Sequence, residues 1–330
     1  MSRPVVAITH DQPDIGRFFA APDLARLEQV AELRVVGRNR AAQLPALGAV
    51  EVLLGSWGMP KIDGEMLTAA PRLRAVCYAA GSVKGFALPE AFARDVIITT
   101  AMHANAVPVS EAVVALITLI NKGWFRCQDR IRAHGLDAWK SASAPGNYGA
   151  SVGLVGLGAI GRMVAERLKS LELQVFAFDP YASREAFAQV GAEPVADLVE
   201  LARKSRILSL HAPNIPACTK MIDARVLAAM PDGATFINTA RGALVDETAL
   251  IAELRTGRID AHLDVTQPEP PAAGSELLRL PNVWLTPHLA GSINDEIRRM
   301  GKLAIDECLR ILAGQPAQHR VLEHHLATMA

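Results

Sequence analysis

The sequence has no net charge, few cysteines and few aromatic residues. Its 34 Lys and Arg balance its 34 Asp and Glu, and no basic block is present to bind nucleic acid. The cysteines lie far apart without a C-x-x-C pair, which argues against a disulfide framework or a structural zinc site. We therefore expect free thiols and a cytoplasmic location. The four residues are Cys77, Cys127, Cys218 and Cys308.

The sequence also has no evident membrane-spanning or signal segment. Its most apolar stretch, Val107–Ile120, contains Ser110 and Glu111 and is shorter than the roughly 20 residues that a membrane-spanning helix needs. The first residues run directly into the strand-like Val5–Ile8, without the apolar region and cleavage site of a signal peptide. We expect no membrane partner.

Half of the residues are hydrophobic, which suffices for large cores, and the length suggests about two domains. Short apolar runs alternate with segments of helical period, which predicts an α/β fold with parallel sheets and helices on both faces. The predicted strands are Val5–Thr9, Leu33–Val36, Val50–Leu54, Ala75–Tyr78, Val96–Thr99, Ser151–Val155, Val175–Phe178, Ile207–Leu210, Thr235–Asn238, Ala261–Val265 and Val283–Leu285.

Helices are predicted between these strands. A long helix is expected over Val107–Gly123, and a final helix over Asp295–Ala313, which stops at a glycine. Shorter helices are expected at Pro22–Val30 and Gly64–Ala70. The stretch Ser141–Gly149 is rich in Ser, Ala, Gly and Pro and is predicted to be a loop.

A glycine-rich turn follows the predicted strand Ser151–Val155 and precedes a helix expected over Arg162–Leu171. Such a turn suits a dinucleotide because one glycine permits the tight turn, another admits the pyrophosphate, and the third allows close packing of helix and strand. The amides at the start of the helix then face the phosphates. The predicted cofactor residues here are Gly156, Gly158, Ala159, Ile160 and Gly161.

Asp179 ends the next predicted strand, close to the spacing expected for the acid that binds the adenosine ribose. A carboxylate accepts hydrogen bonds from ribose hydroxyls and repels a 2′-phosphate, which favours NAD over NADP. Arg184 follows in the next turn and leaves some use of NADP open. The alternative is that Asp179-Pro180 merely ends a strand and starts a turn.

Three polar segments at predicted strand ends offer groups for redox chemistry. Oxidising a hydroxy acid needs a cation for the carboxylate, an acid–base group, and a group that holds the acid–base residue. Arg241 has the fork geometry that suits a carboxylate, and His288 titrates near neutral pH. Glu269 lies between two prolines, and Asp264 closes the preceding strand. Taken singly, each of these residues is equally well explained as structural or solvent-exposed.

The order and spacing of these segments resemble the D-specific 2-hydroxyacid dehydrogenase family over nearly the whole chain. Beyond the glycine turn, the resemblance rests on Asn105–Glu111 (N-A-V-P-V-S-E), His211-Ala212-Pro213, Asn238–Gly242 (N-T-A-R-G), Leu263–Val265 with Glu269-Pro270, and Thr286–Gly291 (T-P-H-L-A-G).

The resemblance implies a role for each candidate. Arg241 would bind the substrate carboxylate and keto oxygen, His288 would be the acid–base, and Glu269 would hydrogen-bond His288 and raise its pKa. Other positions would bind the cofactor or, in the first domain, the substrate carboxylate. The cofactor set is Asp264, Thr239 and Ala240 at the nicotinamide end with His211 and Pro213 near the adenosine, and the substrate set is Ala80, Gly81 and Ser82.

The family's topology implies a Rossmann-type NAD-binding domain, residues 105–292, inserted in a flavodoxin-like substrate domain, residues 1–104 plus 293–330. The reaction would take place in a cleft between them that closes over substrate. Family members are commonly dimers, which implies a homodimer through Val107–Gly149. The small-molecule partner would be a 2-keto or 2-hydroxy acid, and which one is left open, as is the physiological direction.

Some features depart from the family pattern or leave alternatives. Cys218 replaces a usual threonine, and His262 replaces a small or aliphatic residue. The histidines His319, His324 and His325 have no carboxylate or thiol partner at convincing spacing, so we predict no metal site. A formate- or phosphite-type dehydrogenase of the same family and a non-catalytic NAD-sensing regulator are the alternative functions.

Overall fold

The computed structural model describes residues 3–11, 14–140 and 143–329, which form two compact units. Unit 1 comprises Met1–Asn105 and Ser292–Ala330, and unit 2 comprises Ala106–Gly291. Of the predicted loop Ser141–Gly149, residues 141–142 lie outside the described residues, and the remainder contains no helix or strand.

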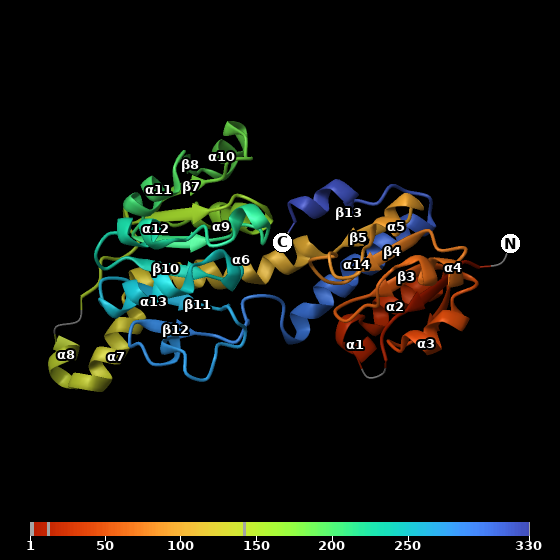
Figure 1. Cartoon of the computed structure of the whole chain (residues 1–330), viewed down its shortest axis with the longest axis horizontal. Coiled ribbons are helices and arrows are strands. Elements are labelled where there is room, and N and C mark those ends of the chain that lie inside the picture. Colours follow the sequence, from red (N-terminus) through yellow and green to blue (C-terminus); the bar gives the residue numbers. More distant parts are fainter. Residues whose placement is uncertain (1–2, 12–13, 141–142, 330) are drawn as a thin grey trace. The chain divides into compact units, whose positions relative to one another are not determined.

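Unit 1 is built on a six-stranded sheet of order β13-β5-β4-β3-β1-β2 (Figure 1). Its first five strands are parallel in the order 2-1-3-4-5, which is the flavodoxin-like arrangement. β13 is antiparallel to β5 and was not predicted from sequence, because only two residues pair. The strands are β1 (Val5–Ile8), β2 (Glu32–Val35), β3 (Val50–Gly55), β4 (Ala75–Tyr78), β5 (Ile97–Thr100) and β13 (Arg320–Val321).

Helices cover both faces of the unit 1 sheet. Val5 and Ala7 of β1 pack into one core cluster, whereas Val6 and Ile8 pack into another, as the alternation of side chains along a strand requires. The last helix, α14, packs against β4 and α1 (Figure 1). The helices are α1 (Asp14–Phe18), α2 (Ala21–Glu28), α3 (Arg40–Gln43), η1 (Leu44–Ala46), α4 (Gly64–Ala69), α5 (Pro89–Ala93), η5 (Asn294–Glu296), α14 (Ile297–Leu312) and η6 (Glu323–Ala327).

Unit 2 is built on a seven-stranded parallel sheet of order β12-β11-β10-β9-β6-β7-β8 (Figure 1). Counted from β6, its strands follow the 3-2-1-4-5-6 order of the Rossmann fold, with β12 added at the edge. The predicted fold class is therefore confirmed in both units. The strands are β6 (Ser151–Val155), β7 (Gln174–Phe178), β8 (Glu193–Pro194), β9 (Ile207–Leu210), β10 (Thr235–Asn238), β11 (Asp260–Leu263) and β12 (Val283–Leu285).

Helices lie between these strands along the chain. Their bounds are α7 (Trp124–His134), α8 (Leu136–Lys140), α9 (Ala159–Leu168), α10 (Arg184–Val190), α11 (Leu198–Lys204), η2 (Pro216–Cys218), α12 (Ala224–Ala229), η3 (Gly242–Leu244), α13 (Glu247–Arg255) and η4 (Glu276–Leu278). α9 begins at Ala159 and not at the predicted Arg162, because Gly158 caps it and Gly161 lies within its first turn. α7 has no buried residue, so no periodic pattern of apolar residues in the sequence indicated a helix there.

The long helix α6 covers Met102–Asn121 and begins five residues before the predicted start, with Pro108 inside it. Among the described residues it is the one helix long and apolar enough to cross a membrane, which corrects the prediction that this stretch is too short. A core helix of a globular domain passes the same test. Val109, Val113 and Ile117, spaced four residues apart, are buried in a core cluster with residues of β6.

Candidate active site

The candidate residues of unit 2 follow neighbouring strands of its sheet at their carboxyl ends. Asp179 comes after β7, the glycine turn after β6, His211 after β9, Thr239–Arg241 after β10, and Asp264 after β11. His288 follows the edge strand β12. Ligands of open α/β sheets bind at this edge, at the point where the strand order reverses. The topology thus brings together residues that are up to 132 positions apart in sequence, from Gly156 to His288.

The three glycines of the turn after β6 have three different surroundings. Gly156 has φ +96° and a β carbon there would lie 2.8 Å from the amide nitrogen of Ala212. A β carbon on Gly161 would lie 2.1 Å from the carbonyl oxygen of Gly156. At Gly158 nothing lies within 4 Å of the added carbon. Gly156 and Gly161 therefore allow neighbouring backbone segments to pack closely. Gly158 leaves open space of the kind that a pyrophosphate fills.

Asp179 is tied to the glycine turn by its own carboxylate. Oδ2 accepts a hydrogen bond of 2.7 Å from the amide of Leu157, and Oδ1 accepts from the amides of Tyr181 and Ala182. Each carboxylate oxygen has two acceptor sites, so the carboxylate can accept further hydrogen bonds, such as those of ribose hydroxyls. Burial, followed by the negative charge of Asp179, raises the pKa of the thiol of Cys218, the residue that replaces the family's usual threonine.

His211 packs beneath the glycine turn. Its carbonyl carbon would lie 2.9 Å from a β carbon on Gly156, and its ring Nε2 is 3.0 Å from the hydroxyl of Ser209. Burial lowers the pKa of His211 to about 4, so the ring is neutral at pH 7. The structure therefore gives His211 a supporting position under the turn, and the adenosine contacts of His211 and Pro213 stay predictions.

Arg241 lies in a turn that is held by Asn238. The side-chain amide of Asn238 donates to the carbonyl of Arg241 at 3.1 Å, and its Oδ1 accepts from the amide of Ala240. The Arg241 guanidinium donates to the carbonyl of Ala240. No ion pair joins it to any of the residues that the structure describes. The hydroxyl of Thr239 is buried and likewise has no hydrogen-bond partner within that part of the chain.

Gly242 fixes the distance between the Arg241 turn and the next loop. A β carbon at Gly242 would lie 2.1 Å from the carbonyl carbon of Thr266, so only glycine fits without movement of backbone. Thr266 begins the loop that carries Glu269. The sequence motif contains Gly242, but its packing role could not be recognised without the position of Thr266.

Asp264 holds the turn that carries His288. Its Oδ1 accepts from the hydroxyl of Thr286 at 2.6 Å and from the amide of Leu289 at 2.7 Å, and its Oδ2 accepts from the amide of Ala290 at 2.9 Å. Its carbonyl accepts from the amide of His288. Asp264 is thus a positioning residue in this structure, a role that the sequence did not reveal. Its predicted contact with the nicotinamide stays a prediction.

His288 and Glu269 form a hydrogen-bonded pair. Nδ1 of His288 lies 2.7 Å from Oε1 of Glu269, and both side chains are roughly four-tenths exposed. His288 has φ +55°, a left-handed conformation that is uncommon for residues other than glycine. Its amide donates to the carbonyls of Asp264 and Thr286, which holds the backbone in that conformation. The two bonds aim the ring toward the Glu269 loop.

In unit 1, the predicted substrate residues Ala80, Gly81 and Ser82 follow β4. Thr100 holds this loop, because its hydroxyl donates to the carbonyls of both Ala80 and Gly81. A β carbon at Gly81 would meet nothing within 4 Å, so one side of the loop is open. Their predicted binding of a carboxylate stays a prediction.

His10 follows β1 at the same edge of the unit 1 sheet as the Ala80–Ser82 loop. Its ring stacks on Phe18 at 4.7 Å, and Arg38 donates to its Nδ1. Its Nε2 is buried and has no partner among the described residues. Trp57 packs edge-on against the same Phe18 at 5.6 Å and is 41% exposed. No sequence motif distinguishes this histidine, because its surroundings come from residues that lie near it only in the folded chain.

The histidines near the C-terminus occupy separate contacts. His319 packs against His103 at 5.3 Å, and His324 packs against His325 at 4.4 Å. In residues 3–11, 14–140 and 143–329, no group of three or more His, Cys, Asp or Glu side chains is arranged to hold a metal ion. The absence of a metal site stays a prediction for the whole chain.

Comparisons with known proteins identify the family. Residues 114–290 match the family described as D-isomer specific 2-hydroxyacid dehydrogenase, NAD binding domain. The chain is 33% identical over 319 residues to D-3-phosphoglycerate dehydrogenase of Mycobacterium leprae (strain TN), covering 96% of this chain and 58% of that protein. It is 33% identical over 296 residues to (S)-sulfolactate dehydrogenase of Chromohalobacter salexigens, covering 89% and 94% of the two chains.

A solved structure of similar fold matches nearly the full length of this chain. The apo form of D-mandelate dehydrogenase from Rhodotorula graminis is 25% identical, with a TM-score of 0.82 over 97% of this chain and 98% of that one. This chain belongs to the D-isomer specific 2-hydroxyacid dehydrogenase family. It spans 58% of the length of the phosphoglycerate dehydrogenase that it matches. The predicted family and the predicted NAD-binding domain type are confirmed.

Proposed function

We propose that the protein interconverts a D-2-hydroxy acid and its 2-keto acid by hydride transfer with NAD. The observation that supports this most directly is the 2.7 Å contact between Nδ1 of His288 and Oε1 of Glu269. A histidine oriented by a carboxylate, at the carboxyl edge of a dinucleotide-binding sheet, is suited to acid–base chemistry.

Each side chain has a distinct task in this proposal. NAD, when bound, accepts or supplies the hydride. Glu269 engages Nδ1 of His288, so Nε2 is left to exchange a proton with the C2 oxygen of the substrate. Arg241, which pairs with no carboxylate of the described chain, binds the substrate carboxylate and the C2 oxygen through its planar fork.

We also assign the cofactor and substrate elements. The glycine turn and Asp179 hold the pyrophosphate and ribose of NAD, while Thr239, Ala240 and Asp264 lie toward the nicotinamide. The open space at Gly158 and the unpartnered hydroxyl of Thr239 fit such a ligand, because a bound group satisfies buried polar atoms. Residues 105–292 are the NAD-binding domain, and residues 1–104 plus 293–330 are the substrate domain, with Ala80–Ser82 binding the carboxylate.

Oxidation of NADH and of NADPH with a panel of 2-keto acids tests the reaction. The panel contains glyoxylate, hydroxypyruvate and phenylpyruvate, run beside Arg241→Lys and the exposed control Arg225→Lys. We expect turnover of one class with NADH in preference to NADPH. Because lysine lacks the bidentate fork, Arg241→Lys should lower kcat/KM roughly 100-fold, mainly through KM, and Arg225→Lys should not.

The same panel distinguishes the alternatives. If NADH binds but no keto acid reacts, hydroxyacid chemistry is wrong, and reduction of NAD by formate or phosphite is measured next. If those donors also fail, the chain is an NAD-binding regulator and not an enzyme. Retention of full activity in Arg241→Lys would show that another cation binds the carboxylate.

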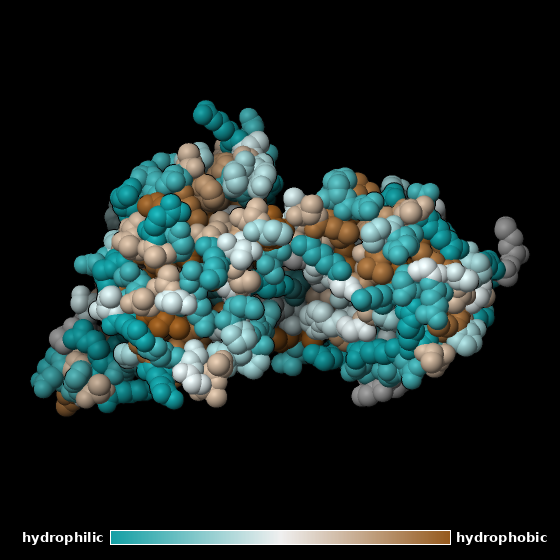
Figure 2. Space-filling view, viewed as in Figure 1, coloured by the Kyte–Doolittle hydropathy of each residue, from teal (hydrophilic) through white to brown (hydrophobic). Residues whose placement is uncertain are grey.

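We further propose a homodimer through Val107–Gly149. Apolar side chains are exposed here among hydrophilic ones, as Figure 2 shows over α7 and α8. Such exposure is common at contacts between proteins. The residues and their exposed fractions are Trp124 61%, Leu136 75%, Trp139 67% and Tyr148 82%.

Analytical ultracentrifugation at micromolar concentration tests the dimer. We expect the wild-type chain to sediment at twice the mass of the 35.3 kDa chain, and Trp139→Ser with Leu136→Ser to sediment as a monomer. Tyr181→Ser is the matched control, because Tyr181 is 79% exposed but lies outside this region. A wild-type monomer, or a dimer that survives both changes, would overturn this interface.

A further inference from the structure

The loop that carries Glu269 is exposed and makes few hydrogen bonds. It leaves the core at Thr266, which is 7% exposed, and residues 267–270 are all exposed. The prolines on either side of Glu269 have no amide hydrogen to donate. Burial therefore does not fix the position of Glu269, although its Oε1 lies 2.7 Å from Nδ1 of His288. Another contact must hold the loop.

The side chain of Glu247 makes such a contact. Its Oε2 accepts a hydrogen bond of 3.2 Å from the amide of Gln267, two residues before Glu269. The only other hydrogen bond from the main body of the protein to residues 267–270, among the described residues, is that of His288 to Glu269. A bond within the loop, from the hydroxyl of Thr266 to the carbonyl of Pro268, stiffens its start. Glu247 is thus the anchor of the loop on the side away from His288.

Glu247 lies in the same segment of chain as Arg241. Gly242, next to Arg241, packs so closely on the loop that an added β carbon would lie 2.6 Å from the amide nitrogen of Gln267. Glu247 is the first residue of α13, and this helix is packed into the core through Leu250, which is 2% exposed. One well-packed segment therefore meets Gln267 twice, through the backbone of Gly242 and through the side chain of Glu247.

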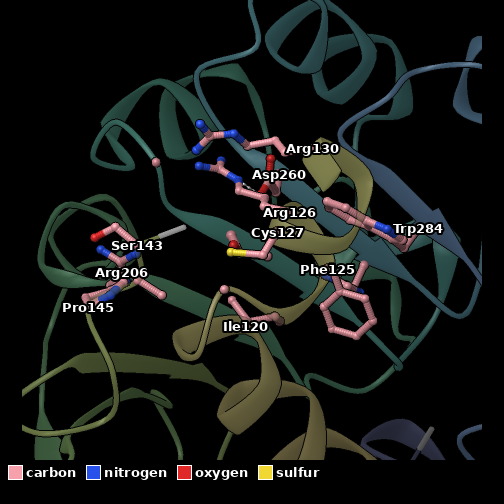
Figure 3. Close-up of a pocket in the computed structure, with 15 residues that line it drawn as sticks. Ile120, Phe125, Arg126, Cys127, Arg130, Ser143, Pro145, Arg206, Asp260 and Trp284 are labelled. Atoms are coloured by element: carbon pink, nitrogen blue, oxygen red, sulfur yellow. Dashed lines mark hydrogen bonds and ion pairs between the residues drawn. The ribbon is translucent and has the colours of Figure 1, made fainter. Parts of the chain in front are cut away.

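The space around Glu247 does not fit a ligand. Glu247, Gly242 and Thr266 line a cavity of about 10 Å³, which holds roughly one water at most. A pocket of about 210 Å³ lies at the opposite, amino ends of β9, β10 and β11 (Figure 3). Most residues that line that pocket belong to Val107–Gly149, the region proposed for the dimer contact. The carboxylate of Glu247 therefore serves the loop and not a bound molecule.

We infer that Glu247 is a positioning residue, which holds the loop so that the carboxylate of Glu269 meets Nδ1 of His288. This inference rests on the proposed function, in which His288 moves the proton and Glu269 orients it. A single proline separates Gln267 from Glu269, so a displacement of Gln267 also displaces the carboxylate. Reaction rates are sensitive to misplacement of catalytic groups by about 1 Å, so a loosened loop should slow the proton transfer.

The charge of Glu247 is not needed for this role. A backbone amide requires only an acceptor oxygen, which glutamine supplies on a side chain of the same length. No ion pair joins Glu247 to a cation within residues 3–11, 14–140 and 143–329. Glu247→Gln should therefore keep the loop in place, whereas Glu247→Ala should release it. Comparison of the two variants separates the hydrogen bond from a direct effect of the negative charge.

Reduction of the preferred keto acid with saturating NADH tests the role. We expect Glu247→Ala to lower kcat roughly tenfold with little change in KM, because the proton donor is less well oriented. The pH above which kcat/KM declines should fall by roughly half a unit, because a carboxylate beside Nδ1 favours the protonated ring that reduction needs. Glu247→Gln should stay within roughly twofold of the wild type. Glu200→Ala, in the first turn of α11, is the matched control and should also do so.

A double variant shows whether Glu247 acts through Glu269. When Glu269→Gln is already present, adding Glu247→Ala should lower kcat by roughly twofold or less, because the carboxylate that Glu247 positions is gone. If the two losses in kcat multiply instead, Glu247 acts independently of Glu269 and the inference is wrong. If Glu247→Ala fails to fold, Glu247→Ser takes its place, since serine is also too short to reach Gln267.

Amide hydrogen exchange gives a readout that needs no substrate. In peptides that cover residues 264–275, exchange should be faster in Glu247→Ala than in the wild type, and unchanged in Glu247→Gln. If the wild type reduces a keto acid but Glu247→Ala matches it in exchange, kcat and pH profile, this inference is wrong and the proposed function stands. If the wild type reduces no keto acid, the proposed function is wrong, and the positioning role falls with it even where Glu247 holds the loop.

Discussion

His288→Gln is expected to lower kcat for reduction of the preferred keto acid by roughly 100- to 10,000-fold, the usual contribution of a positioned acid–base group. Glutamine can still contact Glu269 but cannot deliver a proton at neutral pH. The loss should appear in kcat more than in KM, because the interaction matters most in the transition state. Steady-state rates with NADH measure kcat and KM. The Kd of NADH, from fluorescence, measures cofactor binding separately.

The structure supplies a matched control and a companion variant for this prediction. His324→Gln changes an exposed histidine far in sequence from the site and should leave kcat unchanged. Glu269→Gln keeps the hydrogen-bonding shape but removes the charge next to Nδ1, so its kcat should fall less than that of His288→Gln. If His288→Gln retains more than about a tenth of the wild-type kcat, a different residue moves the proton.

Acidification is expected to destabilise the protein strongly between pH 6.5 and pH 4. Burial lowers the pKa of His211 and of His262 to about 4, and burial with the nearby Arg38 does the same for His10. In an unfolded chain the pKa of each would lie near 6.5, the ordinary value for histidine. Between these values the unfolded chain binds protons that the folded chain does not, so protonation favours unfolding.

The size of this loss of stability follows from the difference between the folded and unfolded pKa values of each histidine. The stabilisation is complete above about pH 6.5 and is lost as pH falls toward 4. At pH 5 the protonation of each histidine on unfolding should lower the free energy of unfolding by about 2 kcal/mol, so the three together lower it by about 6 kcal/mol. That is comparable to the whole free energy of unfolding of many domains. Urea unfolding at pH 7 and pH 5 measures it.

His262→Phe isolates one of the three contributions. Phenylalanine can keep the stack on Trp284 but cannot be protonated. The difference in the free energy of unfolding between pH 7 and pH 5 should therefore be smaller by about 2 kcal/mol in this variant. His324→Gln, on an exposed residue, should not change it. An unfolding free energy that is equal at pH 7 and pH 5 would show that these rings do not take up protons on unfolding. That result would contradict the prediction that burial lowers their pKa in the folded chain.

The sequence predicted the parallel strands well because they are buried on both faces. Val5–Ile8 is a fully buried apolar run, and Ile207–Leu210 is fully buried with Ser209 as its one polar residue; such runs can be recognised in the sequence. The two-residue strands β8 and β13 left no such signal. α7 was missed because none of its residues is buried, so its helical period cannot be read from apolar residues. The early start of α6 was missed because the continuous apolar run on which the prediction rested begins only at about Val107.

The candidate site could be predicted from sequence where a short motif determines the geometry of its own segment. The glycine turn and its helix are of this kind, because the same short segment makes the turn and lines the open space at Gly158. The bonding of Asp264 to Thr286, Leu289 and Ala290 was not predictable, since it joins segments more than 20 residues apart.

The division of unit 1 into two chain segments has a consequence for synthesis on the ribosome. Residues up to Asn105 emerge first, but α14 and β13 follow only after all of unit 2. Until then, the sheet face that α14 covers has no partner, and the edge of β5 is unpaired. Gly301 completes this face by approaching the carbonyl of Phe18 too closely for any larger residue. The nascent first segment therefore exposes apolar surface while some 190 further residues are translated, the stage at which a chaperone would be most useful.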